Sequence, residues 1–170
     1  MDIESLLKLL KENDVDFVVI GASAFPTHGY ARATVDIDLF IRKTVENAQK
    51  TLSALKKFGY DVTDLTADDL LKNKVLIRQY VVETDIHPFV TGITFDDVWA
   101  HKVKDKIGDV EVYIASLDDL IKMKKAAGRD KDLEDLKILE KLKKNELKPA
   151  TTDSARSGDF CPDSQRSDDD

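Results

Sequence analysis

Apolar and polar positions follow two different periods along residues 1–148, and the change of period separates predicted helices from predicted strands. Apolar residues at helical spacing or capping signals predict helices at residues 3–12, 50–58, from 66, 95–100, 116–127 and 130–147. Short runs rich in β-branched residues predict strands at 16–20, 35–41, 75–80, 81–90, 102–107 and 110–114. The interleaved order predicts one domain of the α/β (α+β) class.

Three local features sharpen the ends of these elements. Thr66 and Asp69 have the spacing of a capping box, and Gly59 is suited to end the helix before it. Gly108 lies at the turn of a predicted hairpin formed by residues 102–114. Residues 75–90 fit either a second hairpin or one long strand with a bulge.

Two aspartates interrupt the apolar run Val35-Asp-Ile-Asp-Leu-Phe-Ile41. Strand side chains alternate between faces, so Asp36 and Asp38 are predicted on one face, with Cα atoms ~6.5–7 Å apart. The core side is predicted to hold Val35, Ile37, Leu39 and Ile41. Two such carboxylates can hold a pair of divalent cations, and hard oxygen ligands suit Mg²⁺ or Mn²⁺. A solvated sheet face that carries acids by chance is the alternative.

A turn of small residues, Gly21-Ala-Ser23, follows the first predicted strand and is expected to lead into a short helix reaching His28. Backbone amides and a hydroxyl at such a turn are suited to hold phosphate oxygens. Small turns after strands are common, so the order of parts carries the argument. The order of a strand, a small-residue turn, a short connection and then Asp-x-Asp within a second strand adds weight to the interpretation of the two aspartates as metal ligands.

Residues Val18 to Ile41, with Arg32-Ala-Thr-Val-Asp-Ile-Asp38 at their end, resemble small bacterial and archaeal nucleotidyltransferase-like proteins of the polymerase-β superfamily. The resemblance extends over roughly residues 15–140, through Glu83-Thr-Asp-Ile-His-Pro88 and the final predicted helices. It implies a mixed central sheet flanked by helices, with further helices at the C-terminal end. It also implies that Asp36 and Asp38 bind both metals.

The third carboxylate implied by the resemblance is Asp85, which would bind the catalytic metal and help deprotonate the acceptor hydroxyl; Glu83 is its competitor. The nucleotide-binding residues that it implies are Gly21, Ala22, Ser23, Arg32 and Thr34. Ala22 departs from the family pattern of Gly or Ser, and its methyl group narrows the approach of phosphate to the backbone.

Several other polar residues have two interpretations each. Arg32 would contact phosphate or pair with a site carboxylate. His28 fits a packed histidine better than a ligand, and His87 lies either near the metal or in solvent. Three basic residues lie together near the last predicted helices: Lys124, Lys125 and Arg129. Their side chains either form a solvated face or contact the triphosphate or a nucleic-acid acceptor.

The composition and charge of the chain limit the classes of protein to which it can belong. The chain is 42% hydrophobic and 35% charged, as expected of a soluble globular protein, with a net charge of −7. Residues 149–170 carry six Asp and two Arg, a balance of −4, which leaves −3 for residues 1–148 and argues against a non-specific DNA binder. Residues 149–170 also hold the single cysteine, Cys161, and are predicted to be a disordered acidic tail or a non-native extension. No signal peptide or membrane span is predicted, so we expect a cytoplasmic protein.

The resemblance, together with the predicted pair of aspartates, implies an enzyme that uses Mg²⁺ or Mn²⁺ to move a nucleoside monophosphate from ATP or another triphosphate to an RNA end, a protein or a small molecule. A partner protein, as in a toxin–antitoxin pair, is a further expectation. The alternative is a catalytically inactive binding or antitoxin-like module of the same fold. A phosphatase of the haloacid-dehalogenase type is disfavoured because Leu39 to Ile41 continue the strand beyond the two aspartates.

Overall fold

A computed structural model describes residues 2–146, so the predictions for residues 149–170 and Cys161 lie outside the described part. Six strands form one sheet: β1 (Phe17–Ile20), β2 (Asp36–Ile41), β3 (Val75–Ile77), β4 (Glu83–His87), β5 (Val103–Ile107) and β6 (Val110–Ile114). The helices are α1 (Ile3–Glu12), α2 (Val45–Phe58), α3 (Ala67–Lys72), α4 (Phe95–His101), α5 (Leu117–Ala127) and α6 (Asp132–Glu146). Two short 3₁₀ turns, η1 (Gly21–Ala24) and η2 (Pro26–His28), follow β1.

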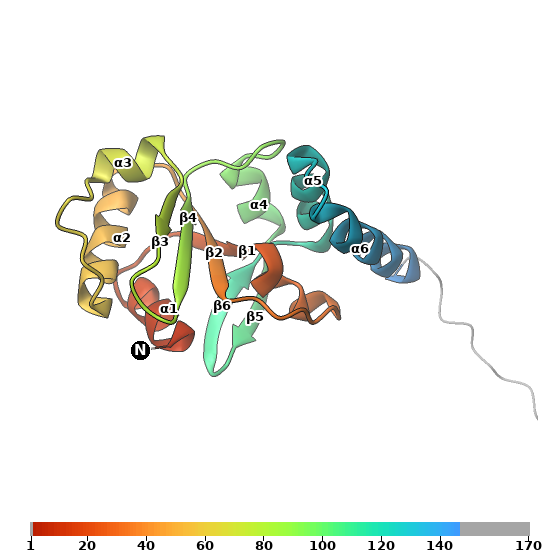
Figure 1. The fold of residues 1–170 in the computed structure, drawn as a ribbon, viewed down its shortest axis with the longest axis horizontal. Helices are drawn as coiled ribbons and strands as arrows, with labels where there is room; N and C mark the ends of the chain where they lie inside the picture. Colours follow the sequence, from red (N-terminus) through yellow and green to blue (C-terminus); the bar gives the residue numbers. More distant parts are fainter. Residues whose placement is uncertain (1, 147–170) are drawn as a thin grey trace, which may run out of the picture.

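The sheet is mixed, with the strand order β3-β4-β2-β1-β6-β5. Strand β2 runs parallel to β4 and β1 runs parallel to β6, while the other neighbours are antiparallel. Figure 1 shows α1, α2 and α3 gathered at one side of the molecule and α5 with α6 at the other. The predicted class, a mixed sheet flanked by helices with helices at the C-terminal end, is confirmed.

The core forms where the apolar runs predicted it. All four residues of β1 are buried, and the apolar stripe of α1 is buried through Leu6, Leu7 and Leu10. Burial of such side chains stabilises the fold by about 1.5–3 kcal/mol each. Among residues 2–146, no helix is long and apolar enough to cross a membrane.

Most element ends agree with the sequence, and the exceptions have local causes. The capping box of Thr66 and Asp69 is confirmed, and Gly59 ends α2 in the left-handed conformation at φ 104°. Helix α2 begins at Val45 rather than residue 50 because the Thr44 side chain caps it, accepting a hydrogen bond from the Asn47 amide at 3.2 Å. Strands β3 and β4 pair antiparallel, so the hairpin interpretation of residues 75–90 is confirmed and the long-strand one is wrong.

Strand β2 follows the predicted alternation with one correction. Ile37, Leu39 and Ile41 are fully buried, but Val35 precedes the strand and is 71% exposed, so its predicted core position is wrong. Phe40 on the opposite face is also buried and packs edge-on against Phe95, with ring centroids 5.3 Å apart. Only the first half of that face, which carries Asp36 and Asp38, is therefore open to a ligand.

Candidate active site

The carboxylates of β2 and β4 lie side by side because the two strands are parallel and in register. Asp38 is the Cα partner of Asp85, and Asp36 is the partner of Glu83. Adjacent strands are about 4.8 Å apart, so paired residues project their side chains from the same face at close range. The register thus brings together acidic groups that are far apart in the sequence.

His87 joins Asp38 and Asp85 in a three-residue cluster. Its Nε2 atom lies 2.8 Å from Asp38 Oδ1, and ligand atoms from all three residues lie within 4.8 Å of one another. Asp36 stands beside this cluster, where its Oδ1 accepts a hydrogen bond from the Thr34 hydroxyl at 2.5 Å. Of the two interpretations of His87, the geometry supports a position at the carboxylates.

Two cationic side chains at the ends of β3 form ion pairs with Asp85. Lys74 Nζ lies 2.8 Å from Oδ2, and Arg78 Nη2 lies 2.6 Å from Oδ1. Burial favours a higher pKa for Asp85, but the ion pairs with Lys74 and Arg78 outweigh it and hold the pKa below its ordinary value. Glu83 is paired with Arg78 Nε at 2.8 Å, so it is Asp85 that faces Asp38 and His87.

The residues present fit a divalent cation. Asp85 Oδ1 is buried and accepts no hydrogen bond of regular geometry, although Arg78 lies close to it. An incompletely satisfied carboxylate oxygen beside a second carboxylate and an imidazole is a donor set that binds Mg²⁺, Mn²⁺ or other divalent cations. Among the described residues, these acids also outnumber their basic partners: the acids are Asp36, Asp38, Glu83 and Asp85, and the bases are Lys74, Arg78 and, only when it is protonated, His87.

Gly21 brings the small-residue turn directly against Asp38. Its φ of +66° is in the left-handed region, and a Cβ atom at this position would overlap the Asp38 carboxylate. Only glycine meets both requirements. Ala22 is buried at the cleft wall, whereas the Ser23 hydroxyl donates to the Asp36 carbonyl at 3.1 Å and so anchors the start of β2. The predicted phosphate contact of Ser23 would require that bond to open.

A cleft of about 750 Å³ runs between this carboxylate wall and helices α5 and α6. Figure 1 shows these two helices on the other side of the molecule from β4 and β3. Of the predicted nucleotide-binding residues, four line the cleft: Gly21, Ala22, Arg32 and Thr34. All three predicted metal ligands line it as well: Asp36, Asp38 and Asp85.

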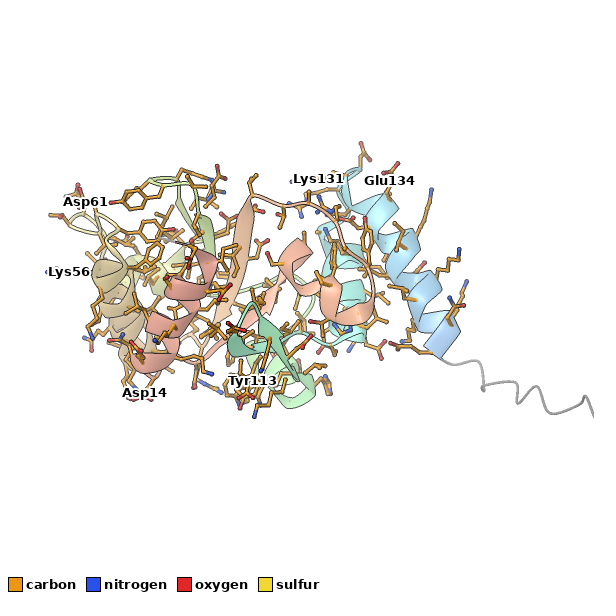
Figure 2. The ribbon with its side chains drawn as sticks, turned by 90° about the horizontal axis from the view of Figure 1, so that it is seen from below. Asp14, Lys56, Asp61, Tyr113, Lys131 and Glu134 are labelled. Atoms are coloured by element: carbon orange, nitrogen blue, oxygen red, sulfur yellow. The ribbon has the colours of Figure 1, made fainter. Side chains whose placement is uncertain are left out.

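The helical wall of the cleft carries a network of ion pairs. Lys124 lies 2.6 Å from Asp132 and 3.2 Å from Asp135, while Arg129 Nε lies 2.6 Å from Asp132. Arg32 reaches Asp135 at 3.2 Å, so it pairs with a carboxylate of α6 and not with one on the strands. Burial favours a higher pKa for Asp132, but Arg129 and Lys124 hold its pKa below the ordinary value. Figure 2 labels Lys131, another lining residue, beside Glu134 where α6 begins.

Two other candidates lie outside the cleft wall. His28 Nε2 is 2.8 Å from the Ala115 carbonyl, which supports its interpretation as a packed histidine. Lys125 pairs with Glu140 at 2.7 Å on the outer surface. The sequence interpretation missed Lys74 and Arg78. The only signal for them was the hairpin option for residues 75–90, which places charges at the ends of β3 next to β4.

Comparison with known protein families matches residues 1–166 to one family, described as nucleotidyl transferase of unknown function. A search of curated proteins found no match.

Proposed function

The chain belongs to the family described as nucleotidyl transferase of unknown function, and from that premise we propose that it transfers a nucleoside monophosphate from a triphosphate such as ATP to an acceptor hydroxyl. The observation that carries the proposal is the cluster of Asp38, Asp85 and His87 in a cleft, against the turn at Gly21. Carboxylates in excess of their basic partners are suited to hold Mg²⁺ or Mn²⁺.

Asp38 and Asp85 would hold the cation, with Asp36 beside them and His87 as a further ligand. A bound divalent cation would neutralise the phosphate oxygens and polarise the phosphorus. Asp85 remains ionised at neutral pH because its pKa is lowered, and such a carboxylate is a good ligand and a weak base.

The phosphate groups of the triphosphate would lie along the segment that includes Gly21, where the backbone approaches the carboxylates closely. Arg32 and Lys124 provide positive charge at the other side of the cleft. In the reaction a bond forms between the acceptor oxygen and the α-phosphorus, and the bond from that phosphorus to the bridging oxygen breaks. Pyrophosphate then leaves with the electron pair, and the acceptor proton passes to solvent.

The acceptor would be an RNA end, a protein or a small molecule. A partner protein, as in a toxin–antitoxin pair, would complete the acceptor site. Incubation with labelled ATP, CTP, GTP or UTP and each acceptor class, with and without cell extract, separates these possibilities. A protein that is monomeric in light scattering and fully active alone would contradict the need for a partner.

The decisive experiment compares wild type with Asp38→Asn in transfer of radiolabel from a triphosphate in Mg²⁺ or Mn²⁺. We expect the variant to lose about 10³-fold in rate, because charge stabilisation by a held cation contributes several kcal/mol. Asp64→Asn, an exposed aspartate of the loop before α3, is the matched control and should retain full activity. Equal rates for Asp38→Asn and wild type would refute the assignment.

The second candidate function is a binding module without catalysis. It is favoured by Lys74 and Arg78, which already occupy the oxygens of Asp85, and by the Ala22 methyl group in the turn. Calorimetry with ATP and Mg²⁺ distinguishes the two functions. Metal-dependent nucleotide binding without transfer to any acceptor class would support the module.

A further inference from the structure

An exposed aromatic ring lies in the cleft, beyond the carboxylates. Phe89 follows β4 by two residues, lines the cleft and is 54% exposed. We propose that Phe89 is the platform on which the nucleobase of the bound nucleoside triphosphate stacks. This inference rests on the proposed function and identifies where the nucleoside part of the substrate binds.

The turn that directly follows Phe89 is anchored on α5, so the backbone that carries the ring is held at the cleft. Val90 and Ile93 form a β-bridge that closes a tight turn, with Gly92 at φ +85°. This turn packs on α5 so closely that a Cβ atom on Gly92 would lie 2.6 Å from the Ala126 methyl group. A backbone that is already anchored loses little conformational freedom on binding, which favours affinity.

The position of Phe89 along the cleft matches the polarity of a nucleotide. Because β2 and β4 are parallel, the segment before β2, with Arg32 and Thr34, and the segment after β4, with Phe89, lie at opposite ends of the strand pair. The carboxylates of Asp38 and Asp85 lie between them. A triphosphate whose α-phosphate sits at the carboxylates and whose outer phosphates point to Arg32 therefore extends its nucleoside toward Phe89.

The distance and the surroundings are suitable for a base. Phe89 lies four positions after Asp85, so their Cα atoms are at most ~13 Å apart along the chain. The same cleft is lined by apolar side chains of the turn and of α5, namely Val90, Leu120, Met123 and Ala127. A flat apolar ring in a cleft that these apolar side chains also line suits the face of a nucleobase and reads none of its edge groups. The platform thus accepts all four bases.

The experiment measures the affinity of ATP and of inorganic triphosphate, each with Mn²⁺, by calorimetry. Phe89→Ala should weaken ATP binding by roughly 5- to 100-fold, the range for loss of one stacked base, and leave the affinity for inorganic triphosphate unchanged. Phe89→Trp should retain ATP affinity. Val35→Ala is the matched control, because Val35 is an exposed apolar residue that lines the other end of the same cleft.

Each outcome separates this inference from the proposed function. If wild type binds ATP no more tightly than inorganic triphosphate, or if Phe89→Ala weakens both equally, the platform is refuted and the proposed function stands. If wild type binds neither ligand, the proposed function itself fails. A Phe89→Ala variant that binds ATP normally but loses association with another protein would overturn the platform in favour of a docking role. Because the ring is largely exposed, the variant should unfold at the same temperature as wild type.

Discussion

The two walls of the cleft both carry buried aspartates, but they balance the charge differently. On the strand wall, among the described residues, three lining acids (Asp36, Asp38 and Asp85) have Lys74 and Arg78 as cationic partners, and Arg78 is shared with Glu83. On the helical wall, two acids, Asp132 and Asp135, face three basic partners: Arg32, Lys124 and Arg129. On the helical wall, basic side chains of the protein balance the charge of the aspartates. On the strand wall, the described basic side chains leave part of the negative charge unbalanced.

This difference distinguishes an acidic residue that stabilises the fold from an acidic residue that is a candidate metal ligand. The Asp132 side chain is only 3% exposed and is held by Lys124 and Arg129, so its charge is satisfied by the fold. The Asp38 side chain is 20% exposed and its contact is with the His87 ring, whose charge depends on protonation. An acid that is satisfied by the fold stabilises it, whereas an acid that faces other acids is available to a cation.

The largest expected effect is on folding stability. Asp132→Asn should lower the free energy of unfolding by about 3 kcal/mol, because it removes the charge of a buried carboxylate that pairs with the largely buried Lys124 and with Arg129. Asp38→Asn should change it by less than about 1 kcal/mol, since it removes one of several neighbouring negative charges. Urea denaturation measures both. If Asp38→Asn proves as destabilising as Asp132→Asn, the two walls do not differ in the way that the charge balance indicates.

Metal addition and removal test the strand wall directly. A Mg²⁺ or Mn²⁺ concentration 100 times the dissociation constant should stabilise wild type by about 2.7 kcal/mol, and chelation with EDTA should reverse the gain. Asp132→Asn should gain the same increment from its lower starting point. Asp38→Asn should gain almost none. Thermal unfolding with and without the metal provides the measurement, and an equal gain in all three proteins would point to a different binding place.

The smallest effect is on metal affinity and concerns Lys74. This side chain is 40% exposed and pairs with Asp85, so its positive charge competes with a cation for the same carboxylate. Lys74→Met should tighten Mn²⁺ binding about fivefold, the size expected for a partly exposed ion pair. Lys72→Met, which removes the surface partner of Asp68 on α3, should leave the affinity unchanged. Weaker Mn²⁺ binding by Lys74→Met in calorimetry would contradict competition.

Local sequence patterns predicted much of the fold. The alternation in β2 correctly placed Ile37 and Leu39 in the core and the two aspartates on the other face. The glycine after β1 indicated the turn, and the structure gives the reason in its close approach to Asp38. The predicted start of the strand at Val35 was wrong, because the strand begins at Asp36. Apolar character alone does not distinguish the last exposed residue of a loop from the first residue of a strand.

The sequence could not predict which charged groups share a wall. Lys74 and Arg78 reach Asp85 only through the pairing of β3 with β4, and Arg32 reaches Asp135 only because α6 lies beside the segment before β2. The interpretation of Arg32 as a partner of a site carboxylate was open for this reason. Its actual partner lies in a helix whose placement no local pattern specifies.

By itself, the sequence determined the helices, the strands and the side of β2 on which Asp36 and Asp38 lie. These features depend on periods of two and of 3.6 residues and on caps that act within one turn. Only the tertiary structure decided that Asp85 and His87 stand beside Asp38, that Lys74 and Arg78 restrain Asp85, and that Phe89 lines the same cleft. Those relations depend on strand register and helix packing, which are fixed by burial across the whole core rather than by neighbouring residues.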